Sequence, residues 1–564
     1  MTPSRSARRA ARCGPWLILL ASSVAAGTAT TPAATPPTVD AGAQLAVGEA
    51  IYRRGTLPSG QEVRATVQGD VPLSGAQAAC ASCHRRSGLG SNEGRSLVAP
   101  VVGDLLYRPV TVGVPGSGRL RSEGPGTRPA YTDAALARAV REGVDPTGRT
   151  LDPLMPRFAL DDEHVAALIV YLKSLSAQGA PGVTDTAIHF ATVVADGIEP
   201  RRREAWIGIM DAYLRDKNGG SRNEEGRRAH GPGVMRREYQ AYRKWEIHVW
   251  ELRGAPVTWG AQLAELYRRQ PVFAILGGIA PGSWQPVHEF SEKQQVPCLF
   301  PITDEPVDAE SDFYTMYFSR GLALEAGALA RHLTADPALR GKTLLQVSRA
   351  GNPSAAPTVL RRGLAGSGVG TVTDVAIEEG VPPTASFWRD LLRRDKPDIV
   401  VAWLSASELG GLDEAARELP PVERIYLSAS LLGESAGALL APVRDRVFLT
   451  YPFELPDPLE TRLARMHAWM RLRGIPRSDD RVQASAFFVL TTAGEALMEM
   501  RGYFSRDYFI ERIEHMIDSS VTSAVYPRLT LSPGARFASQ GCYIVRTQGR
   551  DPARLVAVSD WIVP

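Results

Sequence analysis

The residues with the clearest chemistry are 80–84, which read Cys-Ala-Ser-Cys-His. Two cysteines three positions apart, followed at once by histidine, form the attachment pattern of a c-type haem. The thiols of Cys80 and Cys83 would each add to one porphyrin vinyl group, and the imidazole of His84 would bind the iron. A structural zinc site needs four closely spaced ligands, and no second Cys/His pair lies near the motif. The sequence therefore predicts one covalently attached haem c.

A second axial ligand is expected downstream, and Met155 is the candidate. It lies in a proline-punctuated loop, residues 152–158, directly before Pro156. A thioether ligand would favour the reduced iron and raise the reduction potential. Met155 could instead be an ordinary core residue, and His164 is the nearby rival for the iron. Because His164 falls in the first turn of the next helix, we expect it to face solvent.

The elements that must position these residues are short helices. Residues 48–55 read as a helix with small and aromatic residues on one face, and residues 85–94 are too rich in Gly and Ser to be anything but loop. A later helix can be capped by Asp161, and its apolar residues recur at helical spacing: Val165, Leu168, Ile169 and Leu172. We expect one folded unit from residue 41 to residue 176.

This unit resembles the class I cytochromes c. Residues 48–55 are similar to the amino-terminal helix of that family, in which a glycine and an aromatic residue pack against the carboxy-terminal helix. The stretch 155–172, Met-Pro followed by a helix ending in Tyr-Leu, is similar to the family's close, where the methionine sulfur is the distal ligand. Ala99-Pro100 followed by Gly103 resembles the segment in which a proline carbonyl accepts the Nδ1–H of the iron-binding histidine. The resemblance implies an all-α domain in which the carbonyl of Pro100 orients His84.

The chain changes character after a Gly- and Pro-containing linker at 177–186, which predicts some freedom between the parts it joins. From 187 to 564, apolar strand-like runs alternate with helical patterns, and this alternation predicts parallel sheets with helices on both faces. Two such halves indicate a bilobed α/β protein with a cleft between the lobes. The basic insertion at 221–243 is expected to be a solvated loop.

This second part resembles the periplasmic solute-binding proteins of the branched-chain amino acid (Leu/Ile/Val) type. The resemblance rests on Ala-Ile-Leu-Gly-Gly at 274–278, Val-Pro at 296–297, the aromatic segment 313–320 and Ala-Phe-Phe at 486–488. In that family a turn after a strand presents amides and a hydroxyl to the ligand at a helix start. The resemblance therefore implies a ligand site with Ser283 as the positional candidate and with Thr303 and Asp304 where the family binds an amino group. Trp284 could stack on a ligand or simply fill the cleft. For each of these, an ordinary loop role is the alternative, and the segment 301–306 departs from the family's Ser/Thr-rich loop.

Composition and the amino terminus point to an exported protein. The chain has 564 residues and a net charge of only +3, without the basic stripe expected of a nucleic-acid-binding protein. Arginines followed by an apolar run from Trp16 to Ala26 have the layout of a secretory signal peptide, which we assign to 1–29. Residues 30–40 form a flexible spacer. We expect a periplasmic protein with no transmembrane segment in its mature chain.

Together these features predict an electron carrier more readily than a catalyst, because no hydrolytic, nucleotide-binding or nucleophile motif is present. The leading hypothesis is a periplasmic haem c protein whose second module recognises a small solute or docks a redox partner, either a dehydrogenase or another cytochrome. The alternative is a solute-binding component of an ABC-type importer, or a ligand sensor in which haem is a redox regulator. Whether Cys298 and Cys542 pair in the oxidising periplasm is open.

Overall fold

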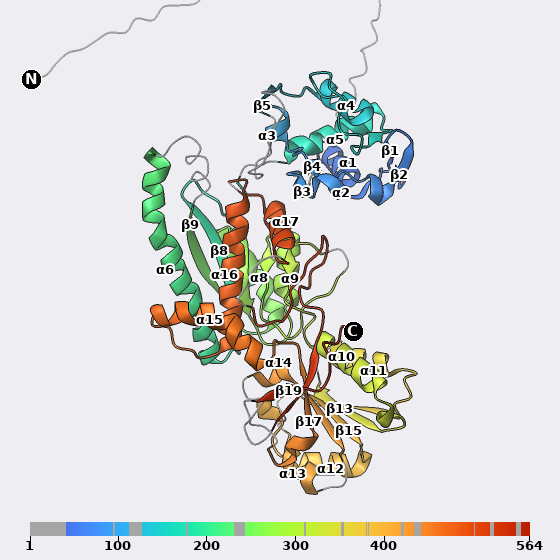
Figure 1. Ribbon diagram of the computed structural model, residues 1–564, viewed down its shortest axis with the longest axis vertical. Helices are drawn as coiled ribbons and strands as arrows, with labels where there is room; N and C mark the ends of the chain where they lie inside the picture. Colours follow the sequence, from blue (N-terminus) through green and yellow to red (C-terminus); the bar gives the residue numbers. More distant parts are fainter. Residues whose placement is uncertain are drawn as a thin grey trace, which may run out of the picture.

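The computed structural model describes residues 41–93, 96–111, 127–175, 179–230, 243–309, 312–350, 355–378, 381, 383–418, 422–433, 441–500, 502–518, 524–548 and 554–564. The expected signal peptide, the spacer and the first residues of the linker lie outside these ranges. Three folded parts follow one another along the long axis of the molecule (Figure 1). They are a small amino-terminal region and two α/β lobes, and the small region lies against the first lobe.

The amino-terminal region is mainly helical but carries a small sheet. Its helices are α1 (Ala41–Arg54), α2 (Ala81–His84), α3 (Gly103–Leu106), α4 (Asp133–Glu142) and α5 (Asp162–Ser174). Its antiparallel sheet has the order β2-β1-β7, from β1 (Arg64–Val67), β2 (Val71–Ser74) and β7 (Arg157–Phe158), and two short pairs add β3 (Ser91–Glu93), β4 (Ser96–Val98), β5 (Val110–Thr111) and β6 (Thr127–Arg128). The region is therefore not all-α, because the turn-rich insertion before the haem motif forms a hairpin that pairs with the residues after Met155.

Helices α1 and α5 form the frame of this region. Gly48 lies so close to α5 that a Cβ atom there would meet the carbonyl oxygen of Ala167 at 2.1 Å. The rings of Tyr52 and Tyr171 pack with centroids 5.2 Å apart, and Tyr52 is fully buried. The glycine-and-aromatic packing expected from the cytochrome resemblance is thus confirmed.

The first lobe is built on a fully parallel sheet of order β12-β11-β10-β8-β9. Its strands are β8 (Ala187–Ala195), β9 (Lys244–Leu252), β10 (Ala274–Ile279), β11 (Cys298–Leu299) and β12 (Thr315–Met316). Its helices are α6 (Pro200–His230), α8 (Trp259–Arg269), α9 (Gln285–Gln294), α15 (Pro456–Leu472), α16 (Asp480–Met500) and α17 (Arg506–Met516). Because α6 continues to His230, the first ten residues of the expected loop at 221–243 are helical instead.

The second lobe has the strand order β14-β13-β15-β16-β17-β18-β19, parallel as far as β17 and antiparallel beyond it. The strands are β13 (Leu344–Arg349), β14 (Val372–Ile377), β15 (Ile399–Trp403), β16 (Arg424–Ser428), β17 (Val447–Tyr451), β18 (Tyr543–Thr547) and β19 (Leu555–Ala557). The helices are α10 (Leu322–Ala335), α11 (Ala355–Leu364), α12 (Ala385–Asp395), α13 (Leu412–Glu418) and α14 (Ala429–Leu432).

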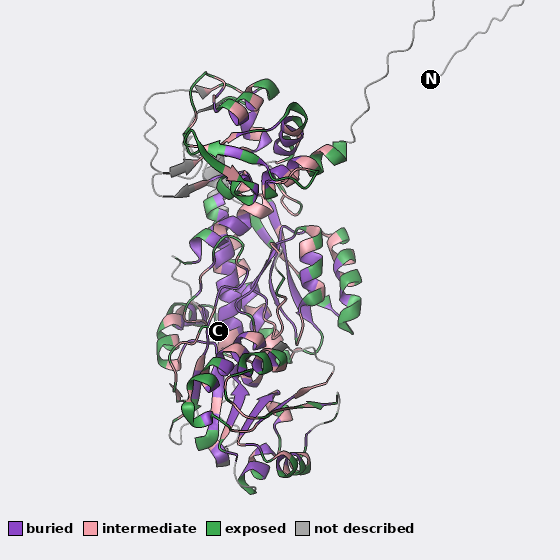
Figure 2. Ribbon diagram, turned by 90° about the vertical axis from the view of Figure 1, so that its right-hand side faces the viewer, coloured by how far each residue is buried: buried purple, intermediate pink, exposed green. Residues whose placement is uncertain are grey.

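The two lobes share the chain rather than following one another. The backbone passes between them after β12, after β17 and again before β18, as the expected bilobed architecture requires. Figure 2 shows that buried residues concentrate in the central strands of both lobes. Cys298 and Cys542 are both buried free thiols, one in β11 and one beside β18.

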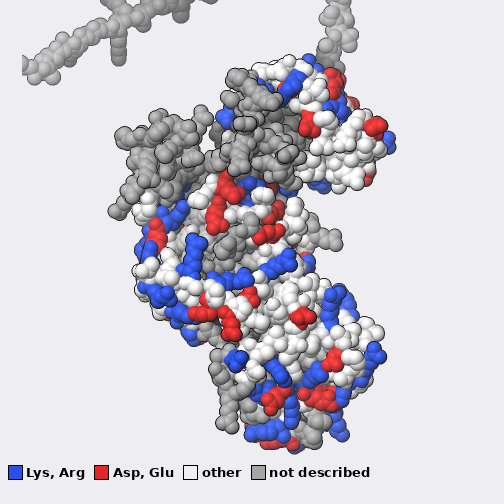
Figure 3. All heavy atoms as spheres, viewed as in Figure 1, with Lys and Arg blue, Asp and Glu red and all other residues white. Residues whose placement is uncertain are grey.

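The charged side chains on the surface are mixed in sign. On the face drawn in Figure 3, basic and acidic side chains are interspersed over both lobes. Within the described ranges, no helix combines the length and apolar character needed to cross a bilayer.

Candidate haem site and its contact with the first lobe

Helix α2 is a single turn that carries Cys83 and His84, and Cys80 stands directly before it. Cys80 precedes the helix in helical backbone geometry, so the thiols of Cys80 and Cys83, three positions apart, lie on the same side of the turn. Both are free thiols; Cys83 is exposed and Cys80 half-buried. Two free thiols at this spacing fit covalent attachment of a porphyrin.

The ring of His84 is held by the backbone. Its Nδ1 donates a hydrogen bond to the carbonyl oxygen of Ala99, 2.8 Å away, which leaves Nε2 as the ring nitrogen that can bind iron. Burial lowers the pKa of His84, partly offset by this hydrogen bond, and so favours the neutral imidazole that ligation requires. The expectation that Pro100 supplies this carbonyl is wrong: the acceptor is one residue earlier, in the peptide unit that precedes the proline. These features fit a haem held by Cys80, Cys83 and His84.

Met155 and Cys80 both pack against the core of the amino-terminal region, and each is half-buried. The backbone N–H of Met155 donates to the carbonyl of Asp152 over 2.9 Å, and Arg157 donates to the carbonyl of Met155. The rival, His164, has its Nδ1 2.7 Å from Oδ1 of Asp161, the capping residue of α5. Met155 as the second iron ligand remains a prediction. The contact with Asp161 engages Nδ1 of His164 at the start of its own helix, α5.

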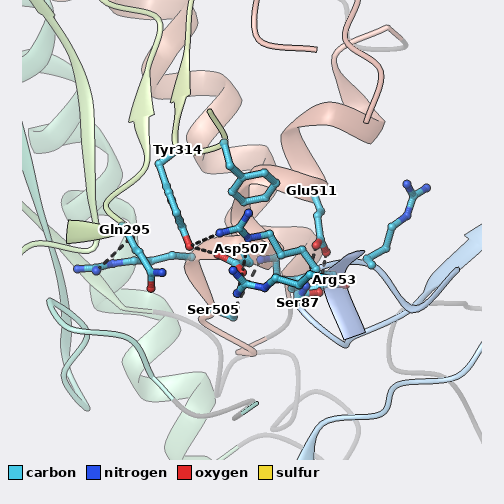
Figure 4. A network of polar contacts seen from close by, with 12 residues as sticks. Arg53, Ser87, Gln295, Tyr314, Ser505, Asp507 and Glu511 are labelled. Atoms are coloured by element: carbon cyan, nitrogen blue, oxygen red, sulfur yellow. Dashed lines mark hydrogen bonds and ion pairs between the residues drawn. The ribbon is translucent and has the colours of Figure 1, made fainter. Parts of the chain in front are cut away.

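The loop that leaves the haem motif makes the contact with the first lobe. Arg86 forms an ion pair with Asp507 of α17, with Nε 3.2 Å from Oδ2, and its guanidinium lies 4.2 Å from the ring centre of Phe313. Arg53 of α1 approaches the same carboxylate at 3.5 Å, and the hydroxyl of Tyr314 donates to it over 2.7 Å. Figure 4 shows Arg53 from the amino-terminal region and Tyr314 from the first lobe converging on Asp507.

A second contact lies one residue further along this loop. The backbone N–H and the hydroxyl of Ser87 donate to the two carboxylate oxygens of Glu511 over 2.8 and 2.6 Å. The pKa of Glu511 is raised to about 8, mainly by burial and also by the nearby Asp507 and Glu514, while the bonds from Ser87 oppose the shift. The buried carboxyl group of Glu511 in α17 is therefore hydrogen-bonded directly to Ser87, which lies three residues after His84.

Helix α17 is itself anchored in the first lobe. Ser505 caps its amino terminus, and Arg506 donates to the backbone carbonyls of Val272 and Phe273 over 2.6 and 3.1 Å. Apolar contacts join the same surfaces, with Tyr503 packed against a buried pair from the amino-terminal region, Val102 and Leu105. The freedom expected across the linker is thus replaced by a network of charged, hydrogen-bonded and apolar contacts.

The four solute-site candidates lie in different surroundings in the structure. The hydroxyl of Thr303 donates to the carbonyl of Gly282 over 2.5 Å, and Ser283 forms a parallel bridge with Glu305, so the two predicted loops lie side by side. Trp284 is fully buried in the first lobe, and a Cβ atom added to Gly278 would meet its ring at 2.6 Å. Trp284 therefore packs in the core of the first lobe, and its contact with a ligand stays a prediction.

Asp304 lies where the first lobe meets the second. Its carbonyl accepts a hydrogen bond from Leu322, the first residue of α10, over 3.1 Å. Burial raises the pKa of Asp304 to about 6, opposed by the charge of Arg202. The pKa of Glu325 is raised to about 7, mainly by burial and to a smaller extent by Asp304, and hydrogen bonds from hydroxyl side chains oppose the shift. Sequence reasoning missed Glu325, a fully buried acid, because a single Glu in an apolar helix carries no motif.

Comparison with known proteins agrees with this division of the chain. Residues 75–176 match the cytochrome c family. A fatty acid ABC transporter substrate-binding protein from Thermomonospora curvata is similar, with a TM-score of 0.50 and 16% identity over 69% of this chain and 95% of its own. A branched-chain amino acid ABC transporter protein from Thermus thermophilus, solved with bound valine, has a TM-score of 0.52 and 12% identity over 68% and 98%. No curated protein matches the chain.

The molecule thus joins a part that matches the cytochrome c family, residues 75–176, to a bilobed α/β part with the fold of these two solved substrate-binding structures.

Proposed function

We propose that this chain is a periplasmic electron-transfer protein that carries one haem c, and that its binding fold recognises a small solute or docks a partner dehydrogenase. Haem bound to Cys80, Cys83 and His84 would supply a one-electron couple. The protein's own contribution is to orient His84 through Ala99, to keep its imidazole neutral and to place Met155 on the same core. Its localisation follows from the expected signal peptide and from the periplasmic chemistry that c-type attachment needs.

This proposal rests on the contact between α17 and the loop that follows His84, residues 85–90, called the haem loop from here on. Arg86 and Ser87 follow His84 closely and bind Asp507 and Glu511 of the binding fold. A binding fold held this close to the haem motif can present a partner to the haem or report a bound solute to it. A solute-binding protein with an unrelated, tethered cytochrome would not need charged pairs at this position.

A small solute would bind between the lobes, near Ser283, Thr303 and Asp304. The Thermus thermophilus protein of the same fold was solved with valine, and free N–H groups and hydroxyls at a helix start suit a carboxylate. The half-buried Asp304 would favour a group that carries a positive charge or donates hydrogen bonds. These assignments are inferences from position in the fold and from the chemistry of the three side chains.

Electron exchange tests the proposal. Oxidised full-length holoprotein is mixed with a purified periplasmic quinoprotein dehydrogenase and its substrate, and haem reduction is followed by difference spectra. Rapid reduction supports electron transfer.

No electron exchange with dehydrogenases or cytochromes of the same periplasm, together with tight amino-acid binding in calorimetry, would instead establish the importer component or ligand sensor. These outcomes distinguish the two functions, because a ligand sensor does not need to exchange electrons rapidly with a partner protein.

A further inference from the structure

A histidine pair at the edge of the first lobe has no part in the haem site or in the lobe junction. His189 lies on β8, and Glu246 and His248 lie on the edge strand β9. The parallel register places His189 beside Glu246 and Ala191 beside His248. Since alternate residues of a strand point to the same face, the three side chains gather on one face of the sheet.

Two of the three distances among their donor atoms match those around a single metal ion. Nδ1 of His189 lies 3.1 Å from Nε2 of His248 and 3.3 Å from Oε2 of Glu246, and the three ligand atoms lie within 4.8 Å of one another. Nitrogen and oxygen ligands sit about 2.0–2.2 Å from zinc in a tetrahedral site, which places them roughly 3.3 Å apart. A sheet edge thus holds two imidazoles and a carboxylate at ligand spacing.

A second cluster of potential metal ligands among the described residues differs, because other groups of the protein already bind its donor atoms. In it, Nδ1 of His288 is 2.9 Å from the hydroxyl of Tyr317 and Nε2 is 2.7 Å from Asp312. Its third member, Glu292, accepts backbone N–H groups from the segment 313–315. The ring nitrogens of His288 and the carboxylate of Glu292 are therefore engaged in hydrogen bonds that hold the fold together. In the first cluster, the same kinds of atom contact one another instead.

The protonation and exposure of the first cluster suit a cation. Burial lowers the pKa of His248, and the neighbouring His189 lowers it further while Glu246 opposes the shift; neutral imidazole is the metal-binding form. The side chain of Glu246 is 54% exposed and that of His189 15% exposed. The cluster is therefore reachable from solvent, and all three of its ligands lie on paired strands of the sheet.

We propose that His189, Glu246 and His248 bind one divalent first-row transition-metal cation of the zinc or copper class. Two imidazoles and a carboxylate favour these ions over magnesium or calcium, which prefer oxygen-only ligand sets. The bound ion would clamp the edge strand β9 to β8 where the linker enters the lobe, since the N–H of His189 donates to the carbonyl of Gly182 over 2.8 Å.

Metal retention by the untagged, full-length holoprotein tests this site. After equilibrium dialysis against Zn²⁺, elemental analysis should find one zinc per chain in addition to the haem iron. His189→Ala and His248→Ala should weaken zinc binding at least tenfold, because each removes a direct ligand. The matched control His515→Ala, which removes an exposed histidine of α17, should leave zinc binding unchanged.

Glu246→Gln gives a further variant that keeps the imidazoles and alters only an exposed side chain, so it should fold and still bind zinc more weakly. With Cu²⁺ as the probe, the electron paramagnetic resonance spectrum of the wild type should show coupling to two imidazole nitrogens, and that of His248→Ala should show coupling to only one. A holoprotein that retains no zinc would overturn the proposal and leave a His189–His248 hydrogen bond as the whole function of the pair. Equal retention by wild type and all three variants would overturn it as well.

Discussion

Replacing Glu511 by glutamine should remove a pH dependence from the stability of this protein. Glu511 is buried against Ser87, and its pKa is raised to about 8, whereas an unfolded chain releases this proton near pH 4.3. The folded form therefore holds a proton that the unfolded form has lost, and stability falls as pH rises from about 4.3 to about 8. Each pH unit inside that window costs about 1.4 kcal/mol, so Glu511 should lower the free energy of unfolding by roughly 2 kcal/mol between pH 6 and pH 7.5.

The variant suits the measurement because a glutamine side chain keeps the shape of the contact. Its carbonyl can accept from the N–H of Ser87, and its amide can donate to the hydroxyl of Ser87. Urea unfolding of the holoprotein is measured at both pH values for wild type and Glu511→Gln. Haem absorbance reports the cytochrome domain, and tryptophan fluorescence reports the binding fold, because residues 41–176 contain no tryptophan.

Comparing the two pH dependences isolates Glu511, since all other titrating groups are common to both proteins. We expect the wild type to lose about 2 kcal/mol more than the variant on going from pH 6 to pH 7.5. Glu289→Gln, which removes an exposed carboxylate from the same lobe, is the matched control and should follow the wild type. If Glu511→Gln also follows the wild type, Glu511 does not hold a proton in the docked state and the reasoning about this contact is wrong.

The remaining predictions concern the domain contact and the haem. Asp507→Asn leaves Arg86 without its charge partner and should lower the free energy of unfolding of the cytochrome domain by about 1–3 kcal/mol; a urea transition unchanged in haem absorbance would contradict this. Met155→His should lower the haem midpoint potential by roughly 0.2 V, because imidazole stabilises ferric iron better than a thioether does; spectroelectrochemistry measures the shift, and an unaltered potential would remove Met155 from the iron. The double variant Cys80→Ser and Cys83→Ser should yield protein without covalently bound haem on a denaturing gel, and retained haem staining would disprove the attachment.

Much of the fold could be predicted because its signals are local. The spacing of Cys80, Cys83 and His84 needs no tertiary information, and the close packing of Gly48 on α5 follows from the cytochrome pattern. The alternation of apolar runs with helical segments was enough to predict two α/β lobes. The hairpin of β1 and β2 was missed because its turn-rich sequence gives no clear period-two pattern.

The rest of the candidate site depends on contacts between distant parts of the chain. Ser87 and Glu511 are 424 positions apart, and no property of either residue marks the other as its partner. Trp284 lies in the expected ligand-binding turn, yet the space beside Gly278 takes its ring into the core. His189 and His248 come together only through the register of two parallel strands, which their separate sequence patterns do not specify.

The central claim is that the haem of this protein exchanges electrons with a partner while docked on the binding fold. Stopped-flow reduction of the oxidised, full-length holoprotein by a reduced quinoprotein dehydrogenase of the same periplasm tests it most directly. We predict that haem reduction accelerates with dehydrogenase concentration, and that Asp507→Asn, in which the contact between haem loop and α17 is weakened, is reduced more slowly at an unchanged midpoint potential. Haem that stays oxidised in the presence of the dehydrogenase, while ascorbate or dithionite reduces it, would contradict the claim.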